Sequence, residues 1–210
     1  MKRRVDGSRD VVSGFSASGA SFIYSATTVP FLGSNVMIEE FRGFNGKFSD
    51  FNWTYVDTKN ILIPYYSHKD AKLRDDYKTA DWRPIAFKGE GSCWADVPWS
   101  LRKVYAVEMT PKRADHPISK RTVYFDTEGL HAVLSEVYDR KGEFWKIWME
   151  GIGHPSGALP NVAKKSTLTW DSASMIDVQA KQCTTISFRV NSLDSVPVSN
   201  YTIEYIRLLQ

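Results

Sequence analysis

The 210-residue sequence has few of the residues and patterns that mark a specific chemistry. It contains only two cysteines, Cys93 and Cys183, and neither lies in a Cys-x-x-Cys pair or at zinc-ligand spacing from a histidine. No apolar run approaches the roughly 18 residues that a membrane-spanning helix needs. The formal net charge is only +3, and basic residues alternate with acidic ones along the chain. These absences argue against a zinc site, a transmembrane helix and a nucleic-acid partner.

The usual catalytic motifs are also missing. None of the four histidines has a second ligand at metal-binding spacing, so a structural role is expected for each. No Gly-x-Ser-x-Gly motif and no glycine-rich phosphate loop is present. The acidic pairs Glu39-Glu40 and Asp75-Asp76 are predicted to be solvated loop charges rather than a two-carboxylate active site. We therefore expect a protein that is not an enzyme and needs no cofactor or metal.

The cysteines and the start of the chain each leave two alternatives open. An oxidising compartment would favour a disulfide between Cys93 and Cys183, whereas two unrelated buried thiols are the ordinary alternative. The basic start, Met1 to Val5, lacks the apolar run of a signal peptide. The protein is therefore either cytosolic or without its original start.

The sequence is rich in aromatic residues, with seven Trp, ten Tyr and eleven Phe, which suit β-strands. The hydrophobic fraction of 42% and the charged fraction of 24% are those of a soluble globular protein. At this length one well-buried core is ordinary, and we expect a single domain over residues 1–210. Residues 1–21 are rich in Gly and Ser and are expected to form a flexible arm.

The strongest local pattern, from Ile118 to Glu150, predicts three consecutive strands joined by two similar turns. Both turns, Asp126 to Gly129 and Asp139 to Gly142, have the spacing Asp-x-x-Gly, which suits a type I turn capped by Asp with Gly at positive φ. If each Asp pairs with the residue after its Gly, one face of this meander is apolar. That face would carry Val123, Phe125, Val133, Val137, Trp145, Ile147 and Met149. These residues are expected to form either a ligand-binding wall or an ordinary core covered by helices of the same chain.

The other face of the predicted meander should align Lys120, Glu136 and Lys146 in a row of alternating charge. Aromatic and apolar residues accompany this row: Tyr124, Leu134, Tyr138, Phe144 and Trp148. Because neither face is plainly polar, the pattern favours a curved or covered sheet over a flat sheet with one wet side.

Outside the meander, a short helix is expected at Asn35–Phe41, capped by Ser34 and lying against the sheet. A hairpin is expected at residues 52–65, and an irregular excursion at residues 67–100. Further elements are expected as strands at residues 101–109, 166–178 and 184–190, and as a terminal helix at residues 199–209.

Several segments resemble, in order and spacing, the carboxyl-terminal half of a bacterial family of unknown function. They are Lys2 to Val5, Phe44-Asn45-Gly46, Phe51-Asn52-Trp53, Ile63-Pro64-Tyr65, Arg102 to Glu108, His116, Lys120-Arg121, Tyr124-Phe125-Asp126, Tyr138-Asp139 and Gly142 to Trp145. The resemblance covers residues 1–150, whereas residues 155–180 do not match the family pattern. Members are similar to outer-membrane lipoprotein-sorting proteins of the LolA/LolB type.

The resemblance implies a mainly β fold, in which a curved antiparallel sheet forms a LolA/LolB-like half-barrel with an apolar concave face and short covering helices. It also implies a periplasmic location, with a signal peptide that this chain lacks. Family members occur with exporters of the resistance-nodulation-division type and an outer-membrane protein. The chain would then be the carboxyl-terminal part of a larger family protein.

The sequence and the resemblance together favour a periplasmic binding or carrier domain for a lipid, a lipoprotein acyl chain or another hydrophobic compound. The ligand would be buried against the seven-residue apolar wall. The alternative is a non-catalytic docking module of an envelope export complex, in which the second sheet face and the Trp-rich excursion bind protein.

Overall fold

The computed structural model describes residues 28–76, 83–154, 168–188, 202 and 205. The fold presented below belongs to one compact unit, Thr28–Ser192. The expected arm at residues 1–21 lies outside the described residues, and so does the expected terminal helix apart from Thr202 and Tyr205. The single-domain organisation therefore stays a prediction.

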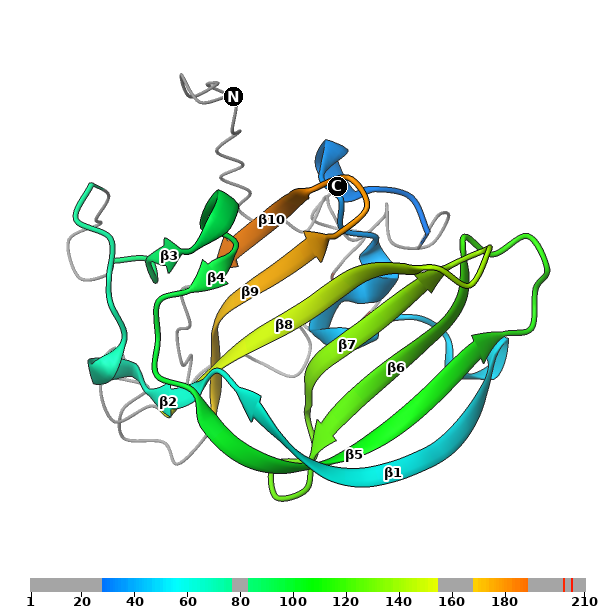
Figure 1. The fold of residues 1–210 in the computed structure, drawn as a ribbon, viewed down its shortest axis with the longest axis horizontal. Coiled ribbons are helices and arrows are strands. Elements are labelled where there is room, and N and C mark those ends of the chain that lie inside the picture. Colours follow the sequence, from blue (N-terminus) through cyan, green and yellow to red (C-terminus); the bar gives the residue numbers. More distant parts are fainter. Residues whose placement is uncertain (1–27, 77–82, 155–167, 189–201, 203–204, 206–210) are drawn as a thin grey trace. The chain divides into compact units, whose positions relative to one another are not determined.

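The unit is built on one curved antiparallel sheet, which confirms the predicted mainly β fold (Figure 1). The strand order is β1-β5-β6-β7-β8-β9-β10, and β2 joins the end of β8 in parallel. Two short strands, β3 and β4, form a separate hairpin. The strands are β1 Phe51–Ile63, β2 Tyr65–Ser67, β3 Phe87–Lys88, β4 Trp94–Ala95, β5 Ser100–Pro111, β6 Ile118–Asp126, β7 Ala132–Asp139, β8 Phe144–His154, β9 Thr169–Asp177 and β10 Gln182–Ser187.

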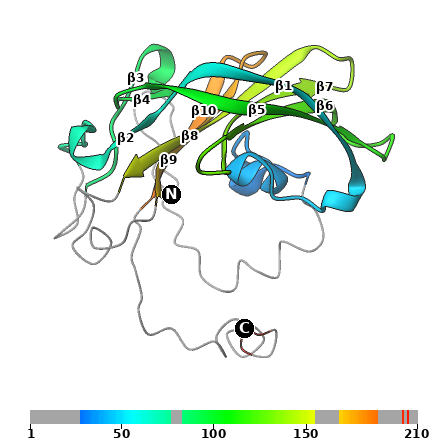
Figure 2. The same cartoon turned by 90° about the horizontal axis from the view of Figure 1, so that it is seen from below.

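Within the unit Thr28–Ser192 the helices described are short 3-10 turns: η2 Phe31–Gly33, η3 Ile38–Gly43, η4 Phe48–Asp50, η5 His68–Asp70 and η6 Glu90–Ser92. The segment η3 lies against one face of the sheet, beneath its arch in Figure 2. A short helical segment thus lies against the sheet, as predicted. It begins at Ile38 rather than at Asn35. Ser34 does not cap it, because its Oγ accepts a hydrogen bond from the Val36 N–H instead, and Met37 is the N-cap residue.

The predicted hairpin at residues 52–65 is wrong, because the two runs form the single strand β1. This strand pairs with β5 from Phe51 to Ile63, with a bulge between Tyr55 and Asp57. The Asp57-Thr58 pair lacks the glycine or asparagine that a two-residue hairpin turn requires. A β-bulge accommodates the irregular position while the strand continues.

The second Asp-x-x-Gly turn has the predicted geometry. The Asp139 carboxylate accepts hydrogen bonds from the Lys141 and Glu143 N–H groups at 2.9 and 3.0 Å. Gly142 has a φ of +83°, as predicted. Since Asp139 and Glu143 close the loop through the 2.9 Å Asp139 N–H to Glu143 carbonyl bond, the expected pairing at this turn is confirmed.

The first turn is one residue longer than predicted. The Asp126 N–H donates to the His131 carbonyl at 3.0 Å, so Asp126 pairs with His131 rather than Leu130. The positive φ, 52°, falls on Leu130, and the prediction of positive φ at Gly129 is wrong. The Asp126 carboxylate still caps the turn by accepting the Gly129 N–H at 2.7 Å.

A bulge at Trp145 changes the register of the predicted meander. Val137 pairs with Lys146, whereas the turn geometry alone would pair it with Trp145. Because side chains alternate along a strand, this one-residue shift moves Lys146 and Trp148 to the face that η3 covers, here called the η3 face. The predicted charge row is therefore wrong for Lys146. Lys120 lies on the opposite face, where its Nζ is 3.0 Å from Glu108, a partner outside the predicted row.

The seven predicted wall residues do not share one face. Val123, Phe125, Val137 and Trp145 pack on the η3 face. Val133 lies in a second bulge and packs with a different cluster: Ile63, Val104, Ala106, Tyr124 and Ile152. Ile147 and Met149 lie on the opposite face, because they pair with Glu136 and Leu134 beyond the Trp145 bulge.

The excursion between β2 and β5 is packed against the opposite face of β9 and β10. Its small core comprises Ile85, Ala95 and Val97, together with Tyr66 of β2. A disulfide joins Cys93 of the excursion to Cys183 of β10, with the two Cα atoms 5.8 Å apart. Of the two alternatives for the cysteines, the structure therefore has the disulfide.

Candidate functional site beneath the η3 segment

The η3 face carries three buried apolar clusters that combine sheet residues with residues of the covering segments. The first contains Phe51, Met109, Val123 and Ala132, with Phe44, Trp53 and Phe125 packed against it; the second contains Met37, Ile118, Val137 and Trp145; the third contains Val36, Trp148, Ala173 and Met175, with Phe41 packed against it. Four of the seven predicted wall residues thus meet here, and side chains from Val36 to Phe44 cover them.

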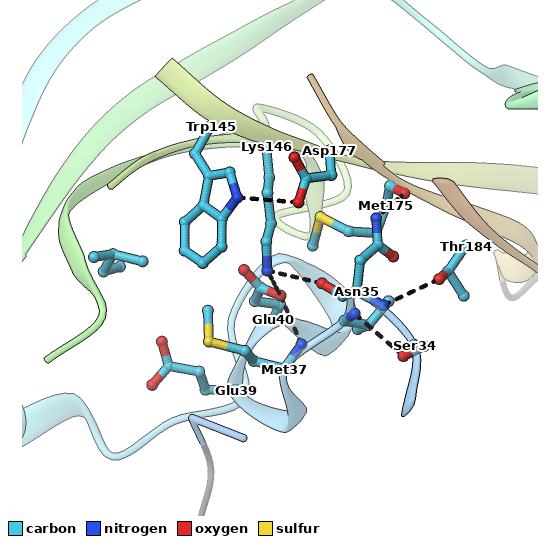
Figure 3. Close-up of polar contacts among 12 residues, drawn as sticks. Ser34, Asn35, Met37, Glu39, Glu40, Trp145, Lys146, Met175, Asp177 and Thr184 are labelled. Atoms are coloured by element: carbon cyan, nitrogen blue, oxygen red, sulfur yellow. Dashed lines mark hydrogen bonds and ion pairs between the residues drawn. The ribbon is translucent and has the colours of Figure 1, made fainter. Parts of the chain in front are cut away.

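A buried cluster of charges lies among these apolar groups and ties η3 to the sheet (Figure 3). The Lys146 ammonium of β8 is 3.3 Å from the Glu40 carboxylate, and Arg121 of β6 is 3.6 Å from the same carboxylate. Arg121 also lies 3.3 Å from Glu39, whose other oxygen is 3.1 Å from His116 Nε2. All five side chains are at most 8% exposed, so solvent screens these pairs weakly.

The same cationic side chains bind backbone carbonyls of the covering segment. Lys146 Nζ donates to the Asn35 carbonyl at 2.7 Å, and Arg121 Nη1 donates to the carbonyls of Glu39 and Gly43 at 3.3 and 3.1 Å. These carbonyls belong to a segment of irregular backbone that could not pair them in a regular ladder. Lys146 and Arg121 therefore stabilise the position of η3 by hydrogen bonds as well as by charge.

Gly43 allows the close approach of η3 to the sheet. Its φ is +77°, and a Cβ atom at this position would lie 2.6 Å from the Cβ of Ala132. A side chain there would force the segment away from β7. The backbone at the end of η3 therefore lies in direct contact with β7.

Burial shifts the ionisation of the central pair in opposite directions. Desolvation raises the pKa of Glu40, although the nearby charges of Arg121 and Lys146 oppose this shift. Desolvation lowers the pKa of Lys146, against the attraction of Glu40. Each residue needs the other to remain charged in this site, and the loss of one partner would favour neutralisation of the other.

A second buried acid, Glu150, lies on the η3 face near Trp148. Trp148 Nε1 donates to Glu150 Oε1 at 2.7 Å, while Oε2 has no hydrogen-bond partner among the described residues. Desolvation raises the pKa of Glu150 to about 8. This carboxyl group is consequently largely protonated at neutral pH and adds a polar atom, without a charge, to an apolar surface.

The apolar surface of the η3 face reaches solvent at an aromatic rim, formed by Phe44, Phe48, Phe51 and Trp53. Phe44 contacts the other three rings at centroid distances of 5.1 to 5.3 Å. Phe48 is 68% exposed, whereas Phe51 is 4% exposed and packs on Val123. A continuous path of apolar side chains therefore leads from the surface to the predicted wall.

A separate polar pair lies on the opposite face, between η5 and β9. His68 Nδ1 is 2.7 Å from Asp171, and this hydrogen bond raises the pKa of the imidazole. No Ser, Thr or Cys hydroxyl or thiol is hydrogen-bonded to the other imidazole nitrogen in the part of the chain that the structure describes. The same residues hold no group of three His, Cys, Asp or Glu side chains arranged for a metal ion. The pair ties the excursion to the sheet.

The buried charges were not predicted from the sequence. Glu39-Glu40 was expected to be solvated loop charge, and this prediction is wrong because both side chains are at most 2% exposed. One signal was available: Lys146 interrupts the apolar run Trp145 to Met149, and the two acids interrupt a similarly apolar run after Val36. A lone cation and a lone acidic pair within apolar segments indicate mutual pairing.

Comparisons with known proteins identify the family and the fold. A family profile described as "Protein of unknown function (DUF1329)" matches residues 20–203. The match extends well beyond residue 150, so the expectation that residues 155–180 depart from the family pattern is wrong. No curated protein sequence matches the chain.

Three solved structures resemble the fold. A domain from Vibrio parahaemolyticus, provisionally assigned as an outer-membrane lipoprotein-sorting protein domain, has a TM-score of 0.50 and 12% identity, covering 87% of this chain and 58% of that one. A LolA superfamily protein from Nitrosomonas europaea has a TM-score of 0.44 and 11% identity, covering 86% and 60%. A DUF1329 family protein from Desulfovibrio piger has a TM-score of 0.45 and 10% identity, covering 97% and 62%. This chain thus spans less than two thirds of each of these structures.

No helix in the described part of the chain has the length and the hydrophobicity to cross a membrane. The covering elements on the η3 face are short 3-10 turns.

Proposed function

The chain belongs to the DUF1329 family, and we propose that it is a periplasmic binding or carrier domain for a lipid, a lipoprotein acyl chain or another hydrophobic compound. The proposal includes work with an export system towards the outer membrane. The LolA-like open sheet, shared with the lipoprotein-sorting domain from Vibrio parahaemolyticus, supports a carrier over an enzyme.

The observation that carries the proposal is the continuous apolar path from the aromatic rim to Val123 and Phe125, two of the predicted wall residues on the η3 face. Phe48 is exposed at the rim, Phe44 contacts it, and Val123 lies buried behind Phe51. Phe125, one of the predicted wall residues, is partly exposed beside this cluster. An exposed aromatic group that leads into an apolar interior is the arrangement that a hydrophobic ligand needs for entry.

Binding would require movement of the covering side chains, because Met37, Phe41 and Phe44 already fill the space over the wall. An entering acyl chain would displace the rim side chains and take their contacts. Burial of apolar ligand surface yields about 0.8 kcal/mol per methylene, so ten buried methylenes would yield about 8 kcal/mol before the cost of ordering the ligand. That energy is sufficient to offset the displacement of a few side chains.

The first test is extraction of lipids from protein purified from the periplasm of a bacterial host, followed by mass spectrometry. We expect a co-purified amphiphile at close to one per protein. The second test is titration of the delipidated protein with a fluorescent fatty acid, with Phe48→Ser as the rim variant.

A matched control for Phe48→Ser is Leu101→Ser, since the two side chains are 68% and 67% exposed. Phe48 precedes the start of β1, whereas Leu101 lies at the other end of the β1–β5 pair. Both substitutions should leave the fold intact because neither side chain is buried. We expect the rim variant to weaken fatty-acid binding several-fold while the control does not. Absence of micromolar binding by the parent protein would contradict the carrier proposal.

A docking module of an export complex is the second candidate, and an exposed apolar strip on β1 and β5 favours it. Leu62 and Leu101 are cross-strand partners with exposures of 58% and 67%. Tyr55 and Tyr105 lie further along the same strand pair, with ring centroids 6.4 Å apart. If the parent protein binds no lipid, and Leu101→Ser abolishes co-purification with an envelope protein, this candidate replaces the carrier.

A further inference from the structure

A cavity of about 280 Å³, open to solvent, lies at one end of the sheet, between the loop joining β5 to β6 and the turn joining β7 to β8. Its lining includes Arg113, His116, Ile118, Ser119 and Arg140. Two arginines and a histidine therefore face a space large enough for a phosphate or carboxylate group with bound water. None of the interactions described for η3 uses these two arginines.

Two guanidinium groups line the cavity, and only one of them is paired with a carboxylate. Arg113 holds the exposed Asp115 through two nitrogens at 2.6 and 2.9 Å. Arg140 donates to the Ala114 carbonyl at 3.3 Å and bonds no carboxylate among the described residues. Both guanidinium groups lower the pKa of Asp115, with Arg113 as the main cause, which places the three charges close together. Asp50 also raises the pKa of Arg113, so Arg140 is the guanidinium group of this cavity that has no carboxylate partner among the described residues.

The cavity also contains an unused hydrogen-bonding group. The Oγ atom of Ser119 is buried and has no hydrogen-bond partner in the described part of the chain. Buried hydroxyl groups are normally satisfied by protein or by a bound group, because desolvation without a partner is unfavourable. An anion held by the arginines would reach this hydroxyl once the Ser119 side chain turned toward the cavity, because Oγ itself is buried in this structure.

The floor of the cavity is continuous with the predicted wall. Ile118 lines the cavity and belongs to the same buried cluster as Val137 and Trp145. His116 lines it as well and contacts Glu39 of η3 through Nε2. An amphiphile with its chain on the η3 face could therefore reach this cavity with its polar end.

We propose that the cavity between Arg113 and Arg140 binds the anionic head group, a phosphate or carboxylate, of an amphiphile whose apolar chain lies on the η3 face. This inference rests on the proposed carrier function. The guanidinium fork of Arg113 would exchange Asp115 for the head group, and Arg140 would supply the balancing charge. Asp115 would then compete with the head group for Arg113, so removal of the Asp115 charge should strengthen binding of the head group.

The experiment compares three probes by calorimetry below their micelle concentrations: dodecyl phosphate, uncharged glycerol monolaurate and inorganic phosphate. The parent protein should bind dodecyl phosphate at least tenfold more tightly than the uncharged probe, the effect of one to two charge-assisted hydrogen bonds. The double variant Arg113→Gln with Arg140→Gln should remove this preference and leave binding of glycerol monolaurate unchanged. Asp115→Asn should strengthen binding of dodecyl phosphate several-fold.

The matched control is Lys103→Gln, which removes one exposed positive charge from β5 at a site far along the strand from Pro111. Lys103→Gln should not change the binding of any of the three probes. If it weakened the binding of dodecyl phosphate as much as the double variant does, the preference would reflect the overall charge of the protein, and the proposal would be overturned. Equal affinity for both amphiphiles would overturn the head-group site and leave the carrier function standing. Tight binding of inorganic phosphate alone would show a free-anion site instead, and failure of both amphiphiles to bind would overturn the carrier function itself.

Discussion

The buried pair of Glu40 and Lys146 offers the sharpest test of how η3 is held on the sheet. The Glu40→Gln variant would leave the Lys146 ammonium buried without its carboxylate partner at 3.3 Å. Removal of one member of a buried ion pair typically costs about 3–5 kcal/mol. Because Lys146 also donates to the Asn35 carbonyl at 2.7 Å, it keeps one hydrogen bond, so we expect a loss near the lower end of that range.

The reciprocal variant, Lys146→Met, should cost less than Glu40→Gln. Glu40 would retain Arg121 at 3.6 Å, and its raised pKa makes protonation of the carboxyl group accessible. Methionine matches the length of the lysine stem and fits the apolar surroundings beside Trp145. The double variant should be more stable than the sum of the two single losses predicts, by about 2 kcal/mol.

Urea denaturation followed by tryptophan fluorescence measures the four free energies of unfolding in this cycle. A coupling free energy below about 0.5 kcal/mol would refute the reasoning, because it would mean that the pair contributes nothing beyond two independent side chains. A suitable control is Glu108 with Lys120, a half-exposed pair 3.0 Å apart on the opposite face, where we expect about 0.2–1 kcal/mol.

Three further predictions follow from individual residues. Burial raises the pKa of Glu150 to about 8 from its ordinary value of 4.5. Between these two pH values the folded state keeps a proton that the unfolded state has lost. Glu150 therefore lowers the free energy of unfolding progressively as the pH rises from about 4.5 to 8. Glu150→Gln should therefore stabilise the protein relative to the parent more at pH 8 than at pH 5, by up to about 1.4 kcal/mol per pH unit in urea denaturation, and equal effects at both pH values would contradict the assignment. Leu130→Gly should stabilise the protein by about 1 kcal/mol, because Leu130 has a φ of 52° that glycine adopts without strain. Gly142→Val should destabilise it by about 1–2 kcal/mol, because Gly142 has a φ of 83°. Melting temperatures that change in the reverse directions would exclude these turn conformations. The paired substitution of Cys93 and Cys183 by serine opens a cross-link with a sequence separation of 90 and should cost about 2–5 kcal/mol, and thiol counts that are equal with and without reductant would rule the bridge out.

Much of the fold was predictable because its signals are local. Alternating apolar residues and the Asp-x-x-Gly turns identify β6, β7 and β8, and the second turn has the predicted pairing of Asp139 with Glu143. The placement of the segment after Ser34 against the sheet followed from its apolar spacing. These features depend on residues that are close together in the chain, so the sequence contains the information directly.

The candidate site was predictable only in part, since the register of the predicted wall residues depends on the bulges at Val133 and Trp145. Neither the bulge at Trp145 nor that at Val133 has a local sequence signal such as a glycine. Each is decided by contacts between distant segments. As a result, four of the predicted wall residues lie on the η3 face and three do not.

The sequence by itself determined the three strands of the meander, their antiparallel order and the aromatic, weakly charged character of the sheet. Only the tertiary structure decided which side of the sheet Lys146 occupies. The bulge at Trp145 places this lysine beside Glu40, which is 106 positions away in the chain. A buried charge is unfavourable until its partner arrives, and the partner is supplied by a segment far from β8 in the chain. The position of η3, and with it the proposed ligand path, therefore depends on long-range pairing of charges within an apolar interior.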